Sequence, residues 1–241
     1  MFIGVDGCKN GWATVALKDG EVSRAILSVE SSFLDLIRRY QEESIVVIDI
    51  PIGLPEKICG SGRRAEQATR EGFRKRCAKG AQSRASSCFS MPSRSAVYQT
   101  ELSDAKISAL ATSEPPRSIS QQTFNILPKV REVDKVLADI GDRNVYESHP
   151  ELAFSVLGDG FTMRHRKKSL GGQHERKSVL LANGFSEVFL SRMRPKGVAL
   201  DDLYDACAMA LIALRIADGS AKPFPIDFQR DARGLRVAIW A

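Results

Sequence analysis

An α/β fold built on a mixed five-stranded sheet flanked by helices is the architecture that this sequence predicts. Three observations lead to it: strand-like runs surround a turn signal near the N-terminus, an uninterrupted apolar run lies at 45–50, and the segment at about 60–141 is helical and loop-rich. An antiparallel hairpin followed by a crossover helix and a buried strand indicates a mixed sheet, because an all-parallel pattern would lack the hairpin.

Three strands and one helix are predicted before the buried strand at 45–50. Asp19-Gly20 is a two-residue hairpin signal, and Ser32 is a typical helix N-cap followed by Asp35 in the first turn. The run at 45–50 is apolar apart from Asp49, as in a parallel strand buried on both faces. The earlier elements are expected at Phe2 to Asp6, Gly11 to Lys18, Glu21 to Val29 and 33–40.

The rest of the chain is mainly helical, with one further strand. Pro128 is expected to open a helix, because proline is favoured in the first helical turn, and Asn144 to Ser148 predicts a short fifth strand. Later helices are expected at Glu151 to Leu157, Gln173 to Asn183, Ser186 to Arg194 and Asp201 to Ala217. A single domain over 1–241 is therefore predicted, with a basic helical insertion at about 60–141 after the fourth strand.

Composition limits the classes of function. Hydrophobic residues make up 43% of the 241 residues and charged residues 27%, an ordinary globular balance. No apolar run approaches the ~20 residues that cross a bilayer, and the N-terminus lacks a secretory pattern. The five cysteines are widely spaced without a C-x-x-C pair, so they indicate neither a zinc site nor a disulfide framework. A cytoplasmic protein that does not bind membranes is expected.

Positive charge gathers in two segments of this basic chain, whose net charge is +6. Such fields attract phosphate on nucleic acid or on a small molecule, although each segment alone is equally consistent with a solvated helix face. The first segment contains Arg63, Arg64, Arg70, Arg74, Lys75, Arg76, Lys79, Arg84 and Arg94. The second contains Arg164, Arg166, Lys167, Lys168, Arg176 and Lys177.

Acidic residues fall at the ends of predicted elements, where side chains from separate elements converge. They are Asp6, Asp49, Glu147, Asp202 and Asp205. Asp6 is equally consistent with a turn and Asp202 with a helix cap, whereas Asp49 and Asp205 lie among apolar residues, where an unpaired carboxylate is costly. Gathered carboxylates repel one another unless a cation neutralises them, so the set predicts a site for Mg²⁺ or Mn²⁺.

The same residues resemble the RNase H-like superfamily, and its RuvC branch in particular. A first strand reading Gly4-Val5-Asp6-Gly7, then a hairpin, a helix and a second acidic strand, is similar to that superfamily's opening. The last helix, at 202–210, is similar to the D-x-x-D-A-x-A-x-A helix of RuvC-type nucleases. The resemblance implies the metal ligands Asp6, Asp49, Asp202 and Asp205. Asp49 stands where RuvC enzymes usually have glutamate.

A resemblance to the family catalogued as domain of unknown function 429 covers nearly the whole chain. Members of this family are predicted to be RNase H-fold nucleases. The resemblance is carried, in order, by Gly4 to Cys8 with Gly11-Trp12, 48–54, Arg63-Arg64, 90–94, 147–151, Lys167 or Lys168, Gly171 or Gly172, and Arg176. It implies an RNase H-like fold and nuclease activity.

These observations predict a divalent-metal-dependent nuclease that hydrolyses phosphodiester bonds in DNA or RNA. The expected catalytic residues are Asp6, Asp49, Asp205, Asp202 and Glu147, with Asp6 shared by two metals about 4 Å apart. The residues expected to hold the phosphate backbone without reading bases are Arg63, Arg64, Arg94, Lys167, Lys168 and Arg176. His149 and His165 are candidates for proton transfer, although His149 is equally consistent with packing. The low aromatic content, 7%, favours duplex or structured substrates.

Two alternatives remain open. The segment from Asp6 to Gly11 is similar to the first phosphate loop of actin-like-fold kinases and ATPases, with Lys9 on the phosphate. Such enzymes need a second Asp-Gly loop, but no glycine follows Asp142, and Asp159-Gly160 follows a helix. The other alternative is a catalytically silent nucleic-acid-binding protein, whose binding would survive replacement of the acidic residues by asparagine.

Overall fold

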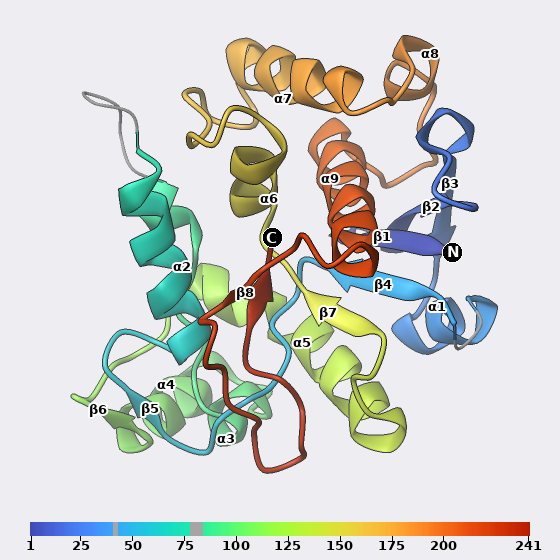
Figure 1. The fold of residues 1–241 in the computed structure, drawn as a ribbon. Coiled ribbons are helices and arrows are strands. Elements are labelled where there is room, and N and C mark those ends of the chain that lie inside the picture. The colour runs from blue at the N-terminus through green and yellow to red at the C-terminus, as the bar shows by residue number, and fades with distance from the viewer. Residues whose placement is uncertain (41–42, 78–83) are drawn as a thin grey trace.

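A mixed sheet forms the centre of the molecule, with helices on both of its faces (Figure 1). The computed structural model describes residues 1–40, 43–77 and 84–241, so the basic residue Lys79 lies outside the described residues. In spatial order the strands are β3 (Ile26–Glu30), β2 (Gly11–Leu17), β1 (Phe2–Cys8), β4 (Ile45–Ile48), β7 (Val145–Glu147), β9 (Ile239–Trp240) and β8 (Pro223–Phe224). The α/β class and the mixed sheet are confirmed.

The strands pair in both directions. β1 is antiparallel to β2 and parallel to β4, β2 is antiparallel to β3, and β4 is parallel to β7. Seven strands of the described chain form this sheet where five were predicted, because β8 and β9 contain two residues each, too few to show an alternating pattern. A separate pair is formed by β5 (Ile58–Cys59) and β6 (Ser113–Glu114).

The connection between β2 and β3 is longer than predicted. Asp19 and Gly20 have φ values of 54° and 80°, as a tight turn requires. A 3₁₀ turn at Val22–Arg24 follows, and the strand begins only at Ile26 instead of Glu21. An extended turn and a strand share the same residue types, so the sequence pattern did not separate them.

The helices divide between the two faces of the sheet. One face is covered by α6 (Pro150–Leu157), α7 (Leu170–Ala182), α8 (Glu187–Leu190) and α9 (Leu200–Ala217), with α2 (Arg64–Lys75) beside them. The other is covered by α1 (Phe33–Arg39), α3 (Arg94–Val97), α4 (Leu102–Ala111) and α5 (Gln121–Ile140). The helices predicted after residue 150 are present, with ends shifted by up to four residues. None of the described helices has both the length and the apolar character that a membrane crossing requires.

Helix α5 begins earlier than predicted. Pro128 lies inside it, and Ser120 is its N-cap, since the Ser120 hydroxyl accepts a hydrogen bond from the Thr123 amide at 3.0 Å. The helix packs on the sheet through Leu127, Val130 and other buried residues. Helix α5, which lies mostly within the segment predicted as an insertion, is thus one of the helices that cover the second face of the sheet.

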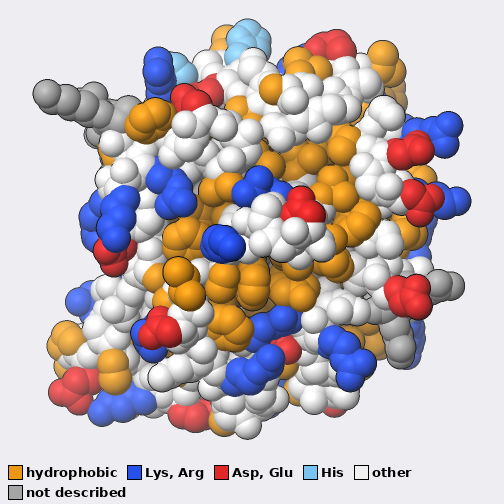
Figure 2. Space-filling model, viewed as in Figure 1, with side chains coloured by type: hydrophobic (Ala, Val, Ile, Leu, Met, Phe, Trp, Pro, Cys, Tyr) orange, Lys and Arg blue, Asp and Glu red, His pale blue; other side chains and the backbone are white. Residues whose placement is uncertain are grey.

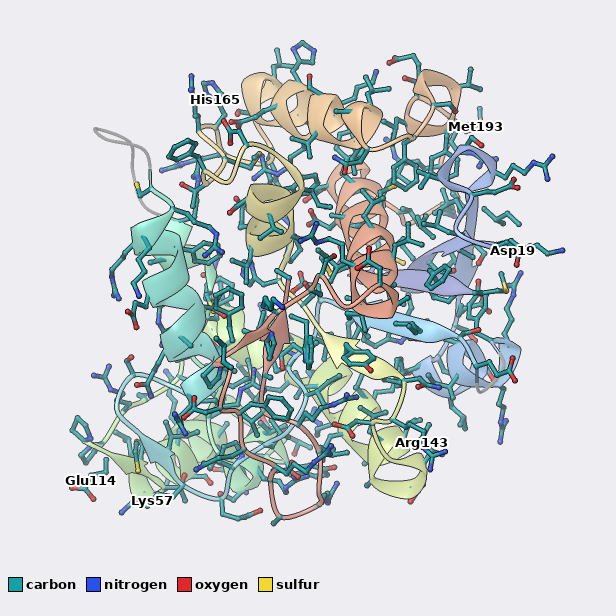
Figure 3. The ribbon with its side chains drawn as sticks, viewed as in Figure 1. Asp19, Lys57, Glu114, Arg143, His165 and Met193 are labelled. Carbon is teal, nitrogen blue, oxygen red and sulfur yellow. The ribbon has the colours of Figure 1, made fainter. Side chains whose placement is uncertain are left out.

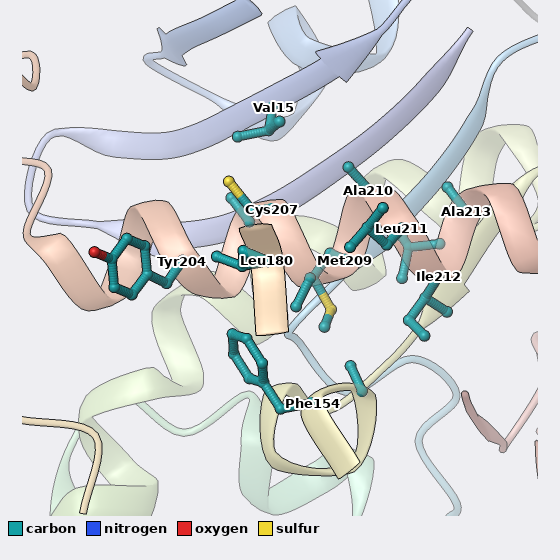
Figure 4. Close-up of a cluster of buried hydrophobic side chains, with 14 of the residues drawn as sticks. Val15, Phe154, Leu180, Tyr204, Cys207, Met209, Ala210, Leu211, Ile212 and Ala213 are labelled. Atoms are coloured by element: carbon teal, nitrogen blue, oxygen red, sulfur yellow. The ribbon is translucent and has the colours of Figure 1, made fainter. Parts of the chain in front are cut away.

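Helix α9 packs against the opposite face of the sheet, and its residues from Leu203 to Ala213 are buried. Cys207, Met209 and Ala210 are fully buried, and Figure 4 shows them between β2 and the helices that carry Phe154 and Leu180. The helix is rich in alanine, which lets its backbone approach the strands closely. This packing fixes where the acidic residues of α9 lie.

Candidate active site

Four of the predicted acidic residues line one cavity of about 690 Å³: Glu147, which is paired with Arg63, and the three residues Asp6, Asp49 and Asp205. Asp6 lies in β1, Asp49 directly follows β4, and Asp205 lies in the first half of α9. Because β1 and β4 are parallel neighbours, Asp6 and Asp49 lie at the same edge of the sheet. The sequence had assigned all three to a shared site, and the structure brings them to one.

The glycine at position 4 allows Asp205 to reach this edge. A Cβ atom on Gly4 would lie 2.0 Å from the Ala206 carbonyl oxygen and 2.2 Å from the Ala210 amide nitrogen. Only glycine permits so close a contact between the β1 and α9 backbones. The pairing of Gly4 with an alanine-rich helix therefore positions Asp205 beside Asp6.

The three carboxylates are poorly solvated and close enough to influence one another. Burial is the main cause that raises the pKa of Asp6 well above its ordinary value, and the charges of Asp205 and Asp49 raise it further. Burial raises the pKa of Asp205 to about 7, against the opposing effect of Lys167. The pKa of Asp49 is also raised by burial. The surroundings of the cluster thus disfavour the state in which all three carboxyl groups are ionised.

Lys167 places one ammonium group in this cluster. Its Nζ donates a hydrogen bond to Asp205 Oδ2 at 2.9 Å and lies 3.6 Å from Asp201 Oδ2. Burial lowers the pKa of Lys167, but the charges of Asp205, Asp6 and Asp49 outweigh it and hold this pKa above its ordinary value. The site already attracts a cation.

Buried polar atoms around the cavity lack partners. Asp205 Oδ1, Glu151 Oε2 and His149 Nδ1 are buried without a hydrogen bond, and all three residues line the cavity. In the described residues no three His, Cys, Asp or Glu side chains are already arranged as a metal-binding group. The donor set nevertheless fits Mg²⁺ or Mn²⁺, because it consists of carboxylate oxygens and includes an unpartnered oxygen beside a bound ammonium.

Asp202 and Glu147 have structural partners. The Asp202 Oδ2 atom accepts a hydrogen bond from the Ala199 amide at 2.8 Å, so this residue caps α9, one of the two uses its sequence position allowed. Glu147 lines the cavity, but its carboxylate accepts hydrogen bonds from Arg63 at 2.6 and 3.1 Å and from the Ile52 amide at 2.7 Å. Burial raises the pKa of Glu147 to about 7, although Arg63 opposes the shift.

Three of the predicted phosphate-binding arginines are buried in ion pairs. Arg63 is 2% exposed and also binds Glu66 at 2.5 Å. Arg94 binds Asp134 at 2.6 Å and Asp231 at 2.5 Å. Arg176 pairs with Glu151. These guanidinium groups form buried ion pairs that hold the fold together, and they do not face solvent. The number of basic residues in a sequence segment does not show whether their side chains are buried or paired.

The remaining predicted cations are more accessible. The side chain of Arg64 is 50% exposed and paired with Asp227, and that of Lys168 is 81% exposed. Blue side chains gather over α2 at the left of Figure 2, where Arg64, Arg74 and Lys75 belong to the helix. A basic surface therefore exists beside the cavity, on α2.

The two histidines occupy different places. His149 lines the cavity, and its ring packs edge-on against Phe73 with 5.5 Å between centroids, which is the packing that its sequence context allowed. His165 is exposed at an outer corner of the molecule, as Figure 3 shows, and does not line the cavity. Proton transfer by His165 is therefore unsupported by its position.

Sequence reasoning missed several residues of the cavity. Glu151 was not assigned to the site although it lies in the 147–151 motif, and Lys129 and Arg84 also line the cavity. Glu151 follows His149 and Pro150 at the start of α6, which directs it toward the carboxyl edge of the sheet. The sequence signal that could have identified Glu151 as a site residue was its position shortly after the predicted fifth strand.

The fold and the site together define an α/β protein with a buried acidic cluster in a cavity bordered by cations. The family described as "Protein of unknown function (DUF429)" matches residues 4–230, and the chain belongs to this family. No curated protein and no solved structure matches the chain.

Proposed function

We propose that this protein is a divalent-metal-dependent nuclease of RNase H-like fold that hydrolyses phosphodiester bonds in nucleic acid. The observation that carries the proposal is the convergence of Asp6, Asp49 and Asp205 from three separate elements on one cavity, with Asp205 Oδ1 buried and unpartnered. An arrangement that raises the pKa of buried carboxylates is typical of functional sites.

The topology supports the fold part of the proposal. The antiparallel pair β1 and β2, the helix α1 and the parallel strand β4 occur in the order that resemblance to RNase H-like proteins implies. Helix α9, which contains the RuvC-like motif, packs directly on β1. The proximity of the two acidic motifs supports the proposed RNase H-like arrangement.

The residues suggest a division of roles. Asp6, Asp49 and Asp205 would hold Mg²⁺ or Mn²⁺, and Asp202 would assist, since its charge also raises the pKa of Asp6. The bound ion would supply charge neutralisation at the phosphate and an activated water. Lys167 and neighbouring cations would attract the phosphate, and His149, with its unpartnered Nδ1, is positioned to accept a proton.

The kinase alternative has less support. Gly7 pairs with Trp12 within the β1–β2 ladder, which leaves Lys9 and Asn10 as a tight connection between the strands. The Lys9 amide donates to the Gly197 carbonyl at 3.2 Å, and the Asn10 side chain donates to the Lys196 carbonyl at 2.8 Å. A loop already bound in this way offers a phosphate little free backbone.

A cleavage assay tests the proposal. Single- and double-stranded DNA and RNA are incubated with the protein and Mg²⁺ or Mn²⁺, using wild type, Asp6→Asn, Asp205→Asn and the surface control Asp104→Asn. We expect cleavage by wild type and the control, and a loss of about 10³-fold or more in the two site variants. Binding without cleavage by wild type would support the silent binding protein instead.

A further inference from the structure

The cavity that contains the three carboxylates is also lined by apolar side chains. We define the apolar chamber by Phe89, Met91, Ile126 and Pro128, which line the same cavity as Asp6 and Asp205. Met91 is buried, whereas Phe89 is 44% exposed, so an aromatic ring remains uncovered at this position. An exposed aromatic side chain beside a charged site is a natural stacking surface.

The dimensions of the cavity favour a small group. Its volume of about 690 Å³ lies within the range of roughly 300–1,000 Å³ typical of sites that enclose a small molecule. A duplex would instead need a long surface groove, since its bases are stacked inside the helix. One unpaired nucleotide has the matching size and combines an apolar base with an anionic phosphate.

Cationic side chains also line the cavity. Lys129 Nζ donates to the Gly11 carbonyl at 2.6 Å and lies 4.0 Å from the centre of the Trp12 ring, which fixes it beside Gly7. Arg84 is held by the Met163 carbonyl at 2.9 Å. Together with Lys167, these side chains provide positive charge for a phosphate on the carboxylate side.

Polar side chains complete the lining. Ser86 and Asn125 line the same cavity, and both carry groups that donate and accept hydrogen bonds. Such groups match the edge of a nucleobase, while the ring of Phe89 matches its face. The combination fits a base in the chamber and a phosphate at the acidic cluster.

We propose that the apolar chamber binds the base of one unpaired nucleotide whose phosphate lies at the Asp6, Asp49 and Asp205 site. This inference rests on the proposed nuclease function and names its ligand class: an unpaired nucleotide at a strand end as the substrate, or a free mononucleotide, which contains no phosphodiester bond and would bind as a product. It departs from the duplex preference that the low aromatic content suggested, because one well-placed ring is sufficient for one base.

Binding experiments separate the chamber from the chemistry. Affinities for AMP, for a duplex with a single-stranded 3′ overhang and for the blunt duplex of the same sequence are measured by calorimetry with Ca²⁺ in place of Mg²⁺, so that a cation neutralises the carboxylates, and gel electrophoresis verifies that the nucleic acid remains uncut. Phe89→Ala is compared with Phe161→Ala, a control with similar exposure that does not line the cavity. We expect AMP or the overhang to bind more tightly than the blunt duplex, and Phe89→Ala to weaken that binding about tenfold or more.

The outcomes distinguish the two proposals. Tight AMP binding identifies a free nucleotide as the source, whereas overhang binding alone identifies a strand end. Equal affinity for overhang and blunt duplex without AMP binding, or an unchanged affinity in Phe89→Ala, would overturn the chamber proposal even if the enzyme cleaves. If Phe89→Ala weakens nucleotide binding but no metal-dependent cleavage is observed, the chamber proposal is supported and the nuclease proposal is rejected.

Discussion

Two sets of buried carboxylates border the centre of this molecule, and they are stabilised differently. In the paired set, Glu147 and Glu66 share the guanidinium of Arg63, and Asp134 is bound by Arg94. In the cavity set, Asp6, Asp49 and Asp205 face one another, and the Lys167 ammonium makes a hydrogen bond to only one of them, Asp205.

The difference separates structural charge from functional charge. Carboxylates that form ion pairs with arginine lock segments of the chain together, because removing either partner leaves a buried charge uncompensated. Carboxylates that lack sufficient partners destabilise the fold unless something binds them, so their presence in a folded protein points to a ligand. The cavity set is of the second kind.

The largest effect is expected from the paired set. Arg63→Met should lower the free energy of unfolding by about 3–5 kcal/mol, because Glu147 and Glu66 would remain buried without their cation. The exposed pair of Arg64 with Asp227 provides the control, and Arg64→Met should change stability by less than about 1 kcal/mol. Urea denaturation measures both, and equal losses would break the distinction between buried and exposed pairs.

The pH dependence of stability sharpens the comparison for the cavity set. The pKa of Asp205 is about 7 in the folded protein and ordinarily 3.8, so the folded state binds more protons between these values. The contribution of Asp205 to stability should therefore be greatest at about pH 4 and should fall as the pH rises toward 7.

Urea unfolding in EDTA at several pH values tests this expectation. Asp205→Asn should reduce the slope without removing it, because the pKa values of Asp6 and Glu147 are raised as well. A stability that rises between pH 4 and 7, or a slope unchanged in Asp205→Asn, would show that these carboxylates are better stabilised than the structure indicates.

A smaller effect is expected at Lys167. If its ammonium competes with a divalent ion for the carboxylates, Lys167→Met should raise the affinity for Mn²⁺ about tenfold. Lys168→Met is the control, since that side chain is largely exposed. Calorimetric titration measures the affinities, and a weaker affinity in Lys167→Met would show that the lysine supports the metal instead of competing with it.

Much of the fold was readable from the sequence because it depends on local patterns. The strands around Asp6 and before Asp49 have strong apolar periodicity, and Ser32 caps its helix as predicted, with its hydroxyl accepting from the Asp35 amide at 3.1 Å. β8 and β9 were not predicted because a strand of two residues is too short to show an alternating hydrophobic pattern. The start of α5 was misplaced because Pro128 was interpreted as a first-turn residue.

The site was readable only in part, because burial and pairing depend on distant residues. Asp6, Asp49 and Asp205 were found because the sequence places the first two near the ends of predicted strands and the third within an apolar helix, although β1 continues to Cys8. Arg63 was interpreted as a phosphate ligand because its partner Glu147 lies 84 positions away in the sequence. No local pattern records such a pairing.

Metal binding by the cavity set is tested most directly by titrating Mn²⁺ into wild type, Asp205→Asn and Asp134→Asn, with folding verified by circular dichroism. Wild type and Asp134→Asn should bind Mn²⁺ with release of protons, while Asp205→Asn should bind about 100-fold more weakly or not at all. Absence of binding to wild type, or equal binding by Asp205→Asn, would contradict the assignment of the cavity carboxylates as metal ligands.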